Sequence, residues 1–416
     1  MTARAGFSSN VNKRFTFVSG RDCGSIRLKL QAEFTMMASD VGLSRRSACC
    51  TLSHFASRPS MGDVFQWKEL APGRGGNPNT MALSSTALCG HSSVLAVADD
   101  FGRLAAFDPA AGTTGLEVFC TCVQANGHAI YDLKWACDDS FIASASADST
   151  VCLTSLTDSR LQPMLMLQST SVSNVKSIAC HPLHSNLLAS GSRDGTLRVW
   201  DTRSRKAFMQ GRLGPELPQA LAAEYISPAR SISSTPQNSP NGVHCLTGLE
   251  FLNNNSIISS SSDGRVCLWD TRNFSSPFII SQASNGKLRA LTCVRVSPCR
   301  TRAAFLTATG YCCVQPLQHL DNVELCTEIP LFPDPALDFG LKLEWSPCGR
   351  FIACGCKDTC VHIVDMTLGV VALRLCGHAG VVKDVAWLKN GIGPGLLSLA
   401  DEGQIRVWHP YMPQAK

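Results

Sequence analysis

The sequence predicts an all-β chain in which seven similar units close into a ring, and three observations predict it. One pattern recurs seven times along the 416 residues: an apolar strand, a strand of small residues, a tight turn and a strand that ends near Trp-Asp. The copies follow one another at a nearly constant spacing, as repeat architectures require. The strands are short and apolar or β-branched, and Asp-Gly supplies the hairpin turn between them.

The clearest two copies are LLASGSRDGTLRVWDTR at 187–203 and SIISSSSDGRVCLWDTR at 256–272. Weaker copies begin near residues 94, 141, 302, 351 and 396. The residues that align at the turn are Gly102, Ser149, Gly195, Gly264, Gly310, Thr359 and Gly403. They are 47, 46, 69, 46, 49 and 44 residues apart. Five of these six spacings lie near the ~40–45 residues of a propeller blade, and the sixth implies an insertion of roughly 25 residues.

Most units also carry a further strand before the pattern begins. The candidates for this strand are 131–135, 175–182, 246–251, 291–298, 341–347 and 382–387. Near the N-terminus, VFQWKEL at 64–70 alternates apolar and polar residues, which is typical of a strand. We expect it to complete the last unit, because a ring whose two ends meet has no free sheet edge.

These features resemble the WD40 β-propeller family across roughly 60–412, so a propeller domain is expected at 56–412. Gly127-His128 and Gly377-His378 match the family's glycine-histidine start, and two units end in its Trp-Asp pair. The resemblance implies a seven-bladed WD40 propeller with a buried His–Ser–Asp–Trp hydrogen-bond network that is only partly present here. The structural residues expected in that network are His128, Ser144, Asp148, Asp194, Asp263, His378 and Trp408.

Two segments are expected to lie outside the blades. Residues 1–55 read as a basic, disordered tail, because the first fifty residues hold eight Lys and Arg against three Asp and Glu. A transit peptide is the less favoured alternative. The Pro- and Ser-rich stretch at 204–242 is expected to be a flexible insertion loop between the third and fourth blades. Ser227, Thr235 and Ser239 precede prolines there. Phosphorylation would add charge at these residues, but chance Ser-Pro pairs are the favoured explanation.

Composition excludes several classes of function. Hydrophobic residues make up 44% and charged residues 17% of a chain with a net charge of +5, which fits a folded protein that does not bind polyanions generally. No apolar run approaches the roughly 18 residues that span a membrane. The glycine-rich stretch at 71–79 lacks the GK[ST] of a phosphate loop and is expected to be a linker. Neither a catalytic constellation, a cofactor nor a small-molecule ligand is expected.

The 21 cysteines follow no clear secretory signal, so we expect reduced thiols in a nuclear or cytosolic protein. Cys354, Cys356 and Cys360, with His362 nearby, raise the question of a zinc site. We expect no metal there, because alternate residues of a strand face opposite sides of the sheet. Small buried cysteines that fill a blade are the favoured interpretation.

The two strongest copies end in the same four residues, Trp-Asp-Thr-Arg. Ring geometry places the two arginines at equivalent strand ends, side by side on one face. Arginine offers a planar fork of donors that suits carboxylates and carbonyls across an interface. The alternative is that Asp-Thr-Arg only begins a solvated turn. The candidate binding residues are Trp200, Asp201, Arg203, Trp269, Asp270 and Arg272.

These motifs resemble the paired WDxR boxes of substrate receptors in cullin-4 RING ubiquitin ligases, which dock on the damaged-DNA-binding adaptor subunit. The order of features is also similar to the denticleless receptors: VLAVADDFG at 94–102, NGHAIYDLKW at 126–135, a WDTR blade, a long insertion and a second WDTR blade. The resemblance implies a non-catalytic nuclear, and also cytoplasmic, receptor. It would present replication and cell-cycle proteins for ubiquitination and meet clamp-loaded DNA indirectly.

Other functions stay open at this point. A WD40 scaffold in another nuclear or cytosolic complex would have the same fold. A receptor for peroxisomal import is a further alternative, although the insertion after the third blade argues against it. Denticleless relatives often continue beyond the propeller into a clamp-binding segment, whereas this sequence ends at Lys416, which leaves that step open. An enzyme is the least expected class.

Overall fold

The structure is a computed structural model that describes residues 60–71, 76–84, 94–109, 120–168, 173–204, 206–212, 244–272, 277, 279–282, 289–320, 322–333, 340–388 and 395–409. All of these belong to one compact unit, His54–Lys416. The expected tail at 1–55, most of the expected insertion, and Ser227, Thr235 and Ser239 lie outside the described residues. Among the described helices, none is long and apolar enough to cross a membrane.

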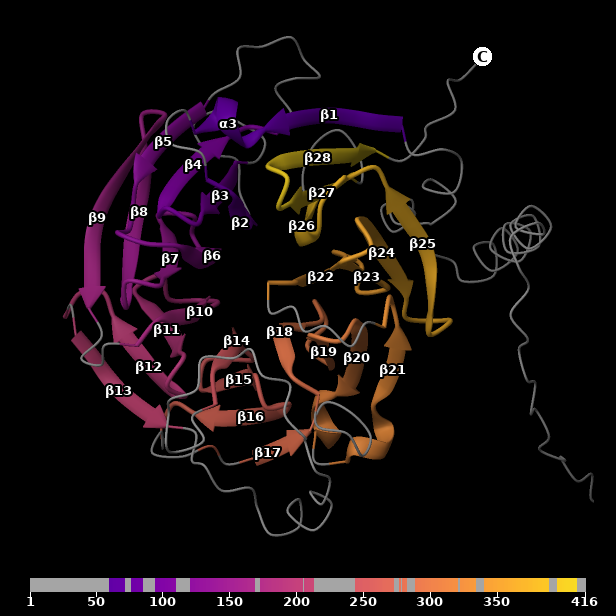
Figure 1. Cartoon of the computed structure of the whole chain (residues 1–416). Helices are drawn as coiled ribbons and strands as arrows, with labels where there is room; N and C mark the ends of the chain where they lie inside the picture. The colour runs from indigo at the N-terminus through magenta and orange to yellow at the C-terminus, as the bar shows by residue number, and fades with distance from the viewer. Residues whose placement is uncertain are drawn as a thin grey trace, which may run out of the picture. The chain divides into compact units, whose positions relative to one another are not determined.

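Seven four-stranded antiparallel sheets surround a common axis, which confirms the predicted seven-bladed propeller (Figure 1). In six of the sheets the first strand in the chain lies innermost and later strands lie progressively outward; in the seventh, β26 lies innermost and the N-terminal strand β1 lies outermost. Blades 1 to 4 consist of β2 (Pro78–Leu83), β3 (Leu95–Asp99), β4 (Arg103–Phe107), β5 (Cys120–Gln124); β6 (Ile130–Trp135), β7 (Ile142–Ser146), β8 (Thr150–Thr157), β9 (Arg160–Gln168); β10 (Val175–Cys180), β11 (Leu187–Ser192), β12 (Thr196–Asp201), β13 (Lys206–Arg212); and β14 (Leu246–Phe251), β15 (Ser256–Ser261), β16 (Arg265–Asp270), β17 (Ile279–Gln282).

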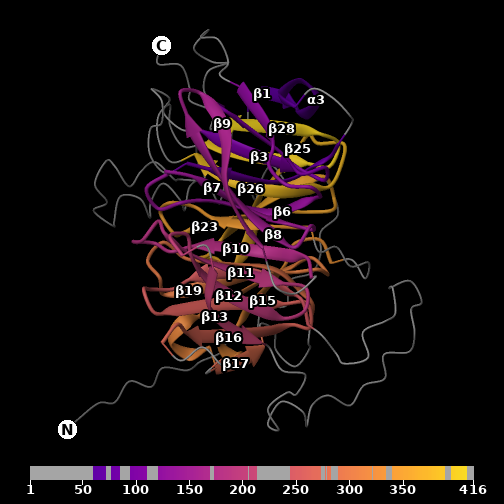
Figure 2. The same ribbon diagram turned by 90° about the vertical axis from the view of Figure 1, so that its left-hand side faces the viewer.

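The remaining three blades follow the same plan. They consist of β18 (Leu291–Val296), β19 (Arg302–Thr307), β20 (Tyr311–Pro316), β21 (Thr327–Pro330); β22 (Leu343–Trp345), β23 (Phe351–Gly355), β24 (Cys360–Asp365), β25 (Val370–Cys376); and β26 (Val382–Leu388), β27 (Gly395–Ala400), β28 (Gln404–His409) with β1 (Ser60–Gln66). The described residues also form three short helical turns, α3 (Trp67–Leu70), η2 (Leu317–His319) and η3 (Val323–Leu325). Figure 2, which turns β9 toward the viewer, shows the blades following one another around the ring.

The seven turn residues aligned from the sequence share one backbone conformation. Each lies between the second and third strands of its blade with a positive φ, from 62° at Thr359 to 90° at Gly264. Glycine adopts this left-handed region without a steric penalty, which explains why five of the seven positions are glycine. Ser149 and Thr359 hold it at 70° and 62° with a side chain attached. The alignment of the repeats from the sequence was therefore correct at every blade.

The N-terminal strand closes the ring as predicted, but it lies earlier than predicted. β1 pairs antiparallel with β28, from Ser60 opposite His409 to Gln66 opposite Gln404. The expected strand at 64–70 gives way to the helical turn α3 after Gln66. Trp67 is buried there, and its Nε1 donates to Asp99 Oδ2 at 3.3 Å. The alternation in VFQWKEL therefore comes from half a strand and one helical turn that both bury apolar side chains.

The sequence pattern missed the fourth strands of blades 1 to 6 and the innermost strand of blade 1. β13, a fourth strand, occupies 206–212, inside the range expected to be an insertion loop, and β2, the innermost strand of blade 1, begins at Pro78, inside the expected linker. Edge strands have one sheet neighbour and face solvent, so their residues need not be small or regularly apolar. β9 illustrates this, because most of its nine residues are exposed or half-buried.

The core lies between neighbouring sheets rather than inside any one of them. Blade 5 packs Cys293, Leu306 and Cys312 against Trp345 and Cys354 of blade 6. Because each sheet is covered by the next around the ring, the inner strands are buried on both faces and carry apolar residues at nearly every position. The strands of blade 1 show this pattern, since every residue of β3 is buried.

Side chains also join the innermost strands at all seven junctions between blades. A carboxylate, an indole or a hydroxyl of one blade bonds the backbone of the next. Around the ring these bonds are Met81 N to Asp384 Oδ2 (2.9 Å), Trp135 Nε1 to Ala82 O (3.1 Å), Ile178 N to Asp132 Oδ2 (3.0 Å), Ser177 Oγ to Leu246 O (3.1 Å), Val296 N to Glu250 Oε2 (2.9 Å), Trp345 Nε1 to Arg295 O (3.0 Å) and Trp387 Nε1 to Glu344 O (3.2 Å).

Lys342 of blade 6 crosses the axis of the ring. Its Nζ lies 2.6 Å from Asp132 Oδ1 of blade 2, 2.6 Å from Thr80 Oγ1 of blade 1 and 3.6 Å from Asp384 Oδ2 of blade 7. We call these four residues the axial cluster. Burial raises the pKa of Asp132, but the charges of Lys342 and of neighbouring cations outweigh it, so the pKa lies below its usual value. The carboxylate is therefore ionised and depends on Lys342 for its charge partner.

Replacing Lys342 by methionine should destabilise the fold strongly, because it leaves two buried carboxylates without their cation. Breaking a buried ion pair in this way costs about 3–5 kcal/mol. The free energy of unfolding in urea measures the effect. Lys68→Met, which removes an exposed lysine from α3, is the matched control and should change it by less than about 0.5 kcal/mol. Equal losses in the two variants would show that the axial cluster contributes nothing specific.

Candidate functional site

The two Trp-Asp-Thr-Arg motifs occupy equivalent places in neighbouring blades. Asp201 ends β12 and Asp270 ends β16, and Trp200 and Trp269 each lie one residue before the aspartate. Both indoles are buried, and their Nε1 atoms donate to Ser190 Oγ at 2.8 Å and to Ser259 Oγ at 2.9 Å. These bonds fix the end of each third strand, so the aspartate and arginine that follow leave the blades at the same face.

Each arginine is held by the aspartate two residues before it. Arg203 Nε and Nη2 lie 3.0 and 2.6 Å from Asp201 Oδ1 and Oδ2, and the corresponding distances from Arg272 to Asp270 are 2.9 and 2.7 Å. Each arginine also donates its backbone N–H to the same carboxylate, at 3.0 and 2.9 Å. The hydrogen bonds from arginine hold the pKa of both aspartates at about 2.

The guanidinium groups are nevertheless open to solvent. The side chains of Arg203 and Arg272 are 74% and 73% exposed. Each aspartate accepts hydrogen bonds from Nε and Nη2 of its arginine, and the Nη1 group of each guanidinium takes no part in the pair. Exposed pairs of this kind add little to stability. They do orient two cations in advance, and such preorganised donors suit carboxylates or carbonyls of a partner protein.

Blade 6 shows what the same turn looks like without this feature. Asp365 ends β24 as Asp201 ends β12, but Thr367 stands where the arginine would be. Thr367 donates its backbone N–H to Asp365 Oδ1 at 2.8 Å, and Arg350 from the preceding loop pairs with Asp365 at 2.9 Å. The carboxylate is fully buried. An aspartate at this position can therefore stabilise its turn without an arginine two residues later. The turn does not require the exposed arginines of blades 3 and 4.

The buried network expected from the WD40 resemblance is most complete in blade 7. Ser398 Oγ lies 2.7 Å from His378 Nε2 and accepts from Trp408 Nε1 at 2.7 Å. His378 Nδ1 lies 2.9 Å from Glu402 Oε1, so a glutamate occupies the acidic position of the turn. The sequence prediction did not include Glu402 or Ser398, although both align with the predicted positions in other units.

In blade 2 the structure corrects the expected role of His128. His128 is exposed, and Asn126 is buried in its place. Asn126 Oδ1 accepts from Ser144 Oγ at 2.6 Å, and its Nδ2 donates to Thr150 Oγ1 at 3.0 Å. The physical reason is that the chain enters β6 with Asn126 turned inward, which leaves the residue two positions later in solvent.

The three acidic residues expected in the network all serve their own turns. Asp148 accepts from Gly127 N at 2.7 Å and from Thr150 N at 2.9 Å. Asp194 accepts from Thr196 N at 3.0 Å. Asp263 pairs with the Arg265 guanidinium and lies 3.2 Å from His244 Nδ1. These carboxylates cap the hairpin between the second and third strands.

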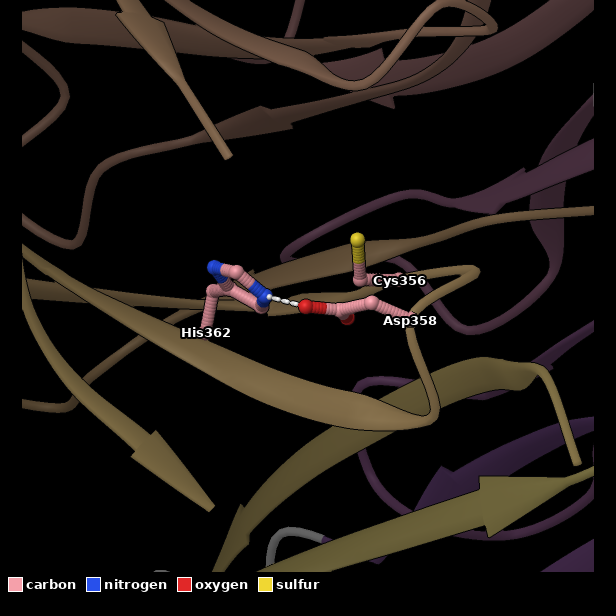
Figure 3. A group of neighbouring side chains, drawn as sticks. All are labelled: Cys356, Asp358 and His362. Carbon is pink, nitrogen blue, oxygen red and sulfur yellow. Dashed lines mark hydrogen bonds and ion pairs between the residues drawn. The ribbon is translucent and has the colours of Figure 1, made fainter. Parts of the chain in front are cut away.

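Blade 6 brings together three side chains of metal-ligating type, Cys356, Asp358 and His362 (Figure 3). His362 Nε2 lies 2.8 Å from Asp358 Oδ2, and Arg374 also pairs with that carboxylate. Burial raises the pKa of the Cys356 thiol to about 12 and lowers the pKa of His362. The expectation of buried cysteines without a ligand set overlooked Asp358, whose turn folds back between the two strands.

One cysteine pair differs from the expected reduced state. Cys360 and Cys376 form a disulfide between β24 and β25. The two residues are direct partners in the ladder, with 4.5 Å between their Cα atoms. The register of the hairpin, which the sequence pattern did not provide, places the two thiols opposite each other.

Removing Arg203 should release the pKa of Asp201. In Arg203→Ala, we expect that pKa to rise from about 2 toward the ordinary value of about 3.9. Because the folded-state pKa is depressed, the pair favours the folded state above about pH 4 and is lost as the pH falls through about 2. NMR titration of the side-chain carboxyl groups measures the pKa of Asp201, with the pKa of Asp270 as the internal control. An Asp201 pKa unchanged in the variant would contradict the pairing.

Replacing Ser398 by alanine should cost more stability than replacing Ser190. Ser398 satisfies two buried partners, His378 and Trp408, whereas Ser190 satisfies the Trp200 indole. Leaving a buried donor unpaired costs about 1–3 kcal/mol, so we expect about 3 kcal/mol for Ser398→Ala and about 1–2 kcal/mol for Ser190→Ala. Chemical denaturation measures both, and the reverse order would refute this account of blade 7.

Comparisons with known proteins agree with this architecture. The model of the "WD domain, G-beta repeat" family matches residues 120–155, 163–201, 231–270 and 340–365, which fall in blades 1 to 4 and in blade 6. Denticleless protein homolog B of Xenopus laevis is 25% identical over 344 residues, covering 77% of this chain and 46% of that protein. Protein lethal(2)denticleless of Drosophila melanogaster is 24% identical over 383 residues, 84% of this chain and 48% of its own.

Cell division cycle protein cdt2 of Schizosaccharomyces pombe is 27% identical over 313 residues, covering 68% of this chain and 59% of its own. The chain thus spans about half the length of the curated relatives it matches. The fold, the matched repeats and these relatives lead to one conclusion: the chain is a seven-bladed propeller of WD40 repeats that is similar to denticleless proteins.

Proposed function

We propose that this chain is a non-catalytic substrate-recognition subunit of a cullin-4 RING E3 ubiquitin ligase. The observation that carries the proposal is the pair of exposed arginines, Arg203 and Arg272, held in the same geometry by Asp201 and Asp270 in consecutive blades. The similarity to denticleless proteins supports it. The chain would attach substrates to the ligase and leave ubiquitin transfer to other subunits.

Docking on the adaptor subunit would use the face that carries Arg203 and Arg272. The aspartates hold the two guanidinium groups in fixed orientations, so less side-chain conformational entropy is lost when a partner binds. The buried indoles of Trp200 and Trp269 fix the strand ends from which the arginines extend. Two cations on neighbouring blades would meet a partner surface that offers carboxylates or carbonyl groups at matching places.

Substrates would bind at the opposite face, where the turns between second and third strands lie. Phe101 lies beside the turn of blade 1 and is 48% exposed, and Phe332 follows β21 and is 42% exposed. Exposed aromatic side chains are common anchors in protein interfaces. The proposed substrates are replication and cell-cycle proteins, with clamp-loaded DNA as an indirect partner and the nucleus, together with the cytoplasm, as the location. The name of the fission yeast relative supports a cell-cycle role.

The test is co-precipitation from cell extract with wild type and with an Arg203→Ala/Arg272→Ala double variant. We expect wild type to bring down the adaptor and cullin-4, and the variant to lose at least about tenfold of both, because it removes the oriented donors of two charge-assisted contacts. The arginines are exposed, so the melting temperature of the variant should equal that of wild type.

Arg193→Ala is the matched control, because Arg193 is exposed in blade 3 but lies at the turn on the opposite face. It should retain the adaptor. If wild type brings down neither subunit, the proposal fails, and a WD40 scaffold in another complex becomes the better account of this fold. If the double variant retains both subunits, docking does not use the arginines.

A further inference from the structure

The blades allow an internal comparison at three positions around the turn between the second and third strands. These positions lie three residues before, one before and three after the residue with positive φ. Blade 3 holds Ser192, Asp194 and Arg198 there, and Arg198 Nη1 donates to Ser192 Oγ at 3.4 Å. In blade 3 one of the three positions is therefore occupied by a positively charged side chain, Arg198, which does not bind metal ions. Corresponding positions hold Ser146, Asp148 and Cys152 in blade 2, Ser261, Asp263 and Cys267 in blade 4, and Ala400, Glu402 and Arg406 in blade 7.

Blade 6 differs because all three positions carry metal-ligating side chains: Cys356, Asp358 and His362. One ligand atom from each lies within 4.8 Å of the other two. Figure 3 shows the imidazole directed at the carboxylate, with the thiol beside it. Cys356 and His362 are each 1% exposed, and the Asp358 side chain is 9% exposed. The set is therefore built into the blade and is not a chance gathering on the surface.

The two ring nitrogens of His362 have different surroundings. Nε2 lies 2.8 Å from Asp358 Oδ2 and is the ring nitrogen that faces the other members of the set (Figure 3). Nδ1 is buried on the other side of the ring, and among the described residues it has no hydrogen-bond partner. An ion bound by this set would therefore be bound through Nε2, in place of the hydrogen bond to Asp358.

We propose that Cys356, Asp358 and His362 bind a zinc ion. Thiolate, imidazole and carboxylate are the side chains that zinc takes in proteins, with bonds of about 2.0–2.3 Å. Such bonds require ligand atoms about 3–4 Å apart, so the three side chains need to move together only slightly. The thiol proton would leave on binding, and the thiolate and carboxylate would neutralise the ion. Three protein ligands leave a fourth coordination position for water.

Arg374 is the group that a zinc ion would displace. It pairs with Asp358 across the edge of the blade, and its side chain is 51% exposed, so it can turn into solvent. The disulfide keeps Cys360 from competing as a ligand. The backbone carbonyl of Cys356 accepts from Val382 N of blade 7 at 3.1 Å. A metal at this turn would therefore also stiffen the junction between blades 6 and 7.

The experiment compares zinc retained by the purified full chain in wild type, Cys356→Ser and His362→Gln, after equilibration in a zinc buffer and gel filtration. We expect wild type to retain about one zinc ion per chain more than either variant, with the same result for cobalt and a thiolate-to-cobalt absorption band in wild type. Cys348→Ser, which removes an exposed thiol, and Cys152→Ser, which removes a buried thiol at the matching turn of blade 2, are the controls and should retain as much as wild type.

Equal metal content in wild type, Cys356→Ser and His362→Gln would overturn the proposal and leave an Asp–His pair that only caps the turn. If the variants do not melt like wild type, zinc X-ray absorption on the wild-type chain decides instead. A shell of one sulfur with nitrogen and oxygen neighbours supports the site. A shell of sulfur alone, or of nitrogen and oxygen alone, overturns it. The outcome is independent of adaptor docking, because Arg203 and Arg272 take no part.

Discussion

The pairing of β1 with β28 is the constraint on which the rest of the structure depends. Six blades are built from consecutive strands, but the seventh takes its outer strand from the beginning of the chain. Without β1, β28 would present an open edge, and Trp67 would lose its place between blades 7 and 1. The hydrogen bonds at the seven inner junctions require every blade to have a neighbour on both sides, so they become available together only when the ring is closed.

Closure also explains why charged residues can lie at the centre. Lys342 reaches Asp132, Thr80 and Asp384 from three different blades, and these contacts exist only when blades 1, 2, 6 and 7 all stand in their places around the axis. The axial cluster thus stabilises the complete ring relative to an incomplete one, because partial assembly leaves buried charges unpaired. The arginine face benefits indirectly, since Arg203 and Arg272 are aligned only as well as blades 3 and 4 are.

The sequence predicted those parts of the molecule that local chemistry decides. Positive φ favours glycine and Asp-Gly turns, so the seven turn residues were identified correctly. The Trp-Asp-Thr-Arg motifs were visible because a buried tryptophan and an exposed arginine lie close together in the chain. The fourth strands of blades 1 to 6 were missed, because an exposed edge strand such as β13 imposes little pattern on its residues.

Other features depend on contacts that no local pattern contains. Lys342 and Asp132 are 210 residues apart, so their pairing follows only from the arrangement of the blades. His128 was expected in the network because Gly127-His128 matches the glycine-histidine motif, whereas the path of the chain into β6 decides that Asn126 is the buried side chain. Asp358 was overlooked beside its cysteines because its role comes from the fold of a turn, and the Cys360–Cys376 bond required the register of a hairpin.

The position of β1 has a consequence for the order of the chain. Ser60 lies opposite His409, so the polypeptide enters and leaves the ring at neighbouring points. The order of the blades around the ring therefore does not depend on the blade at which the chain begins. A circular permutant that joins these two points with a short linker and starts at β14 would keep all the strand pairings described above. Fusion partners attached before β1 or after β28 would emerge from the same blade.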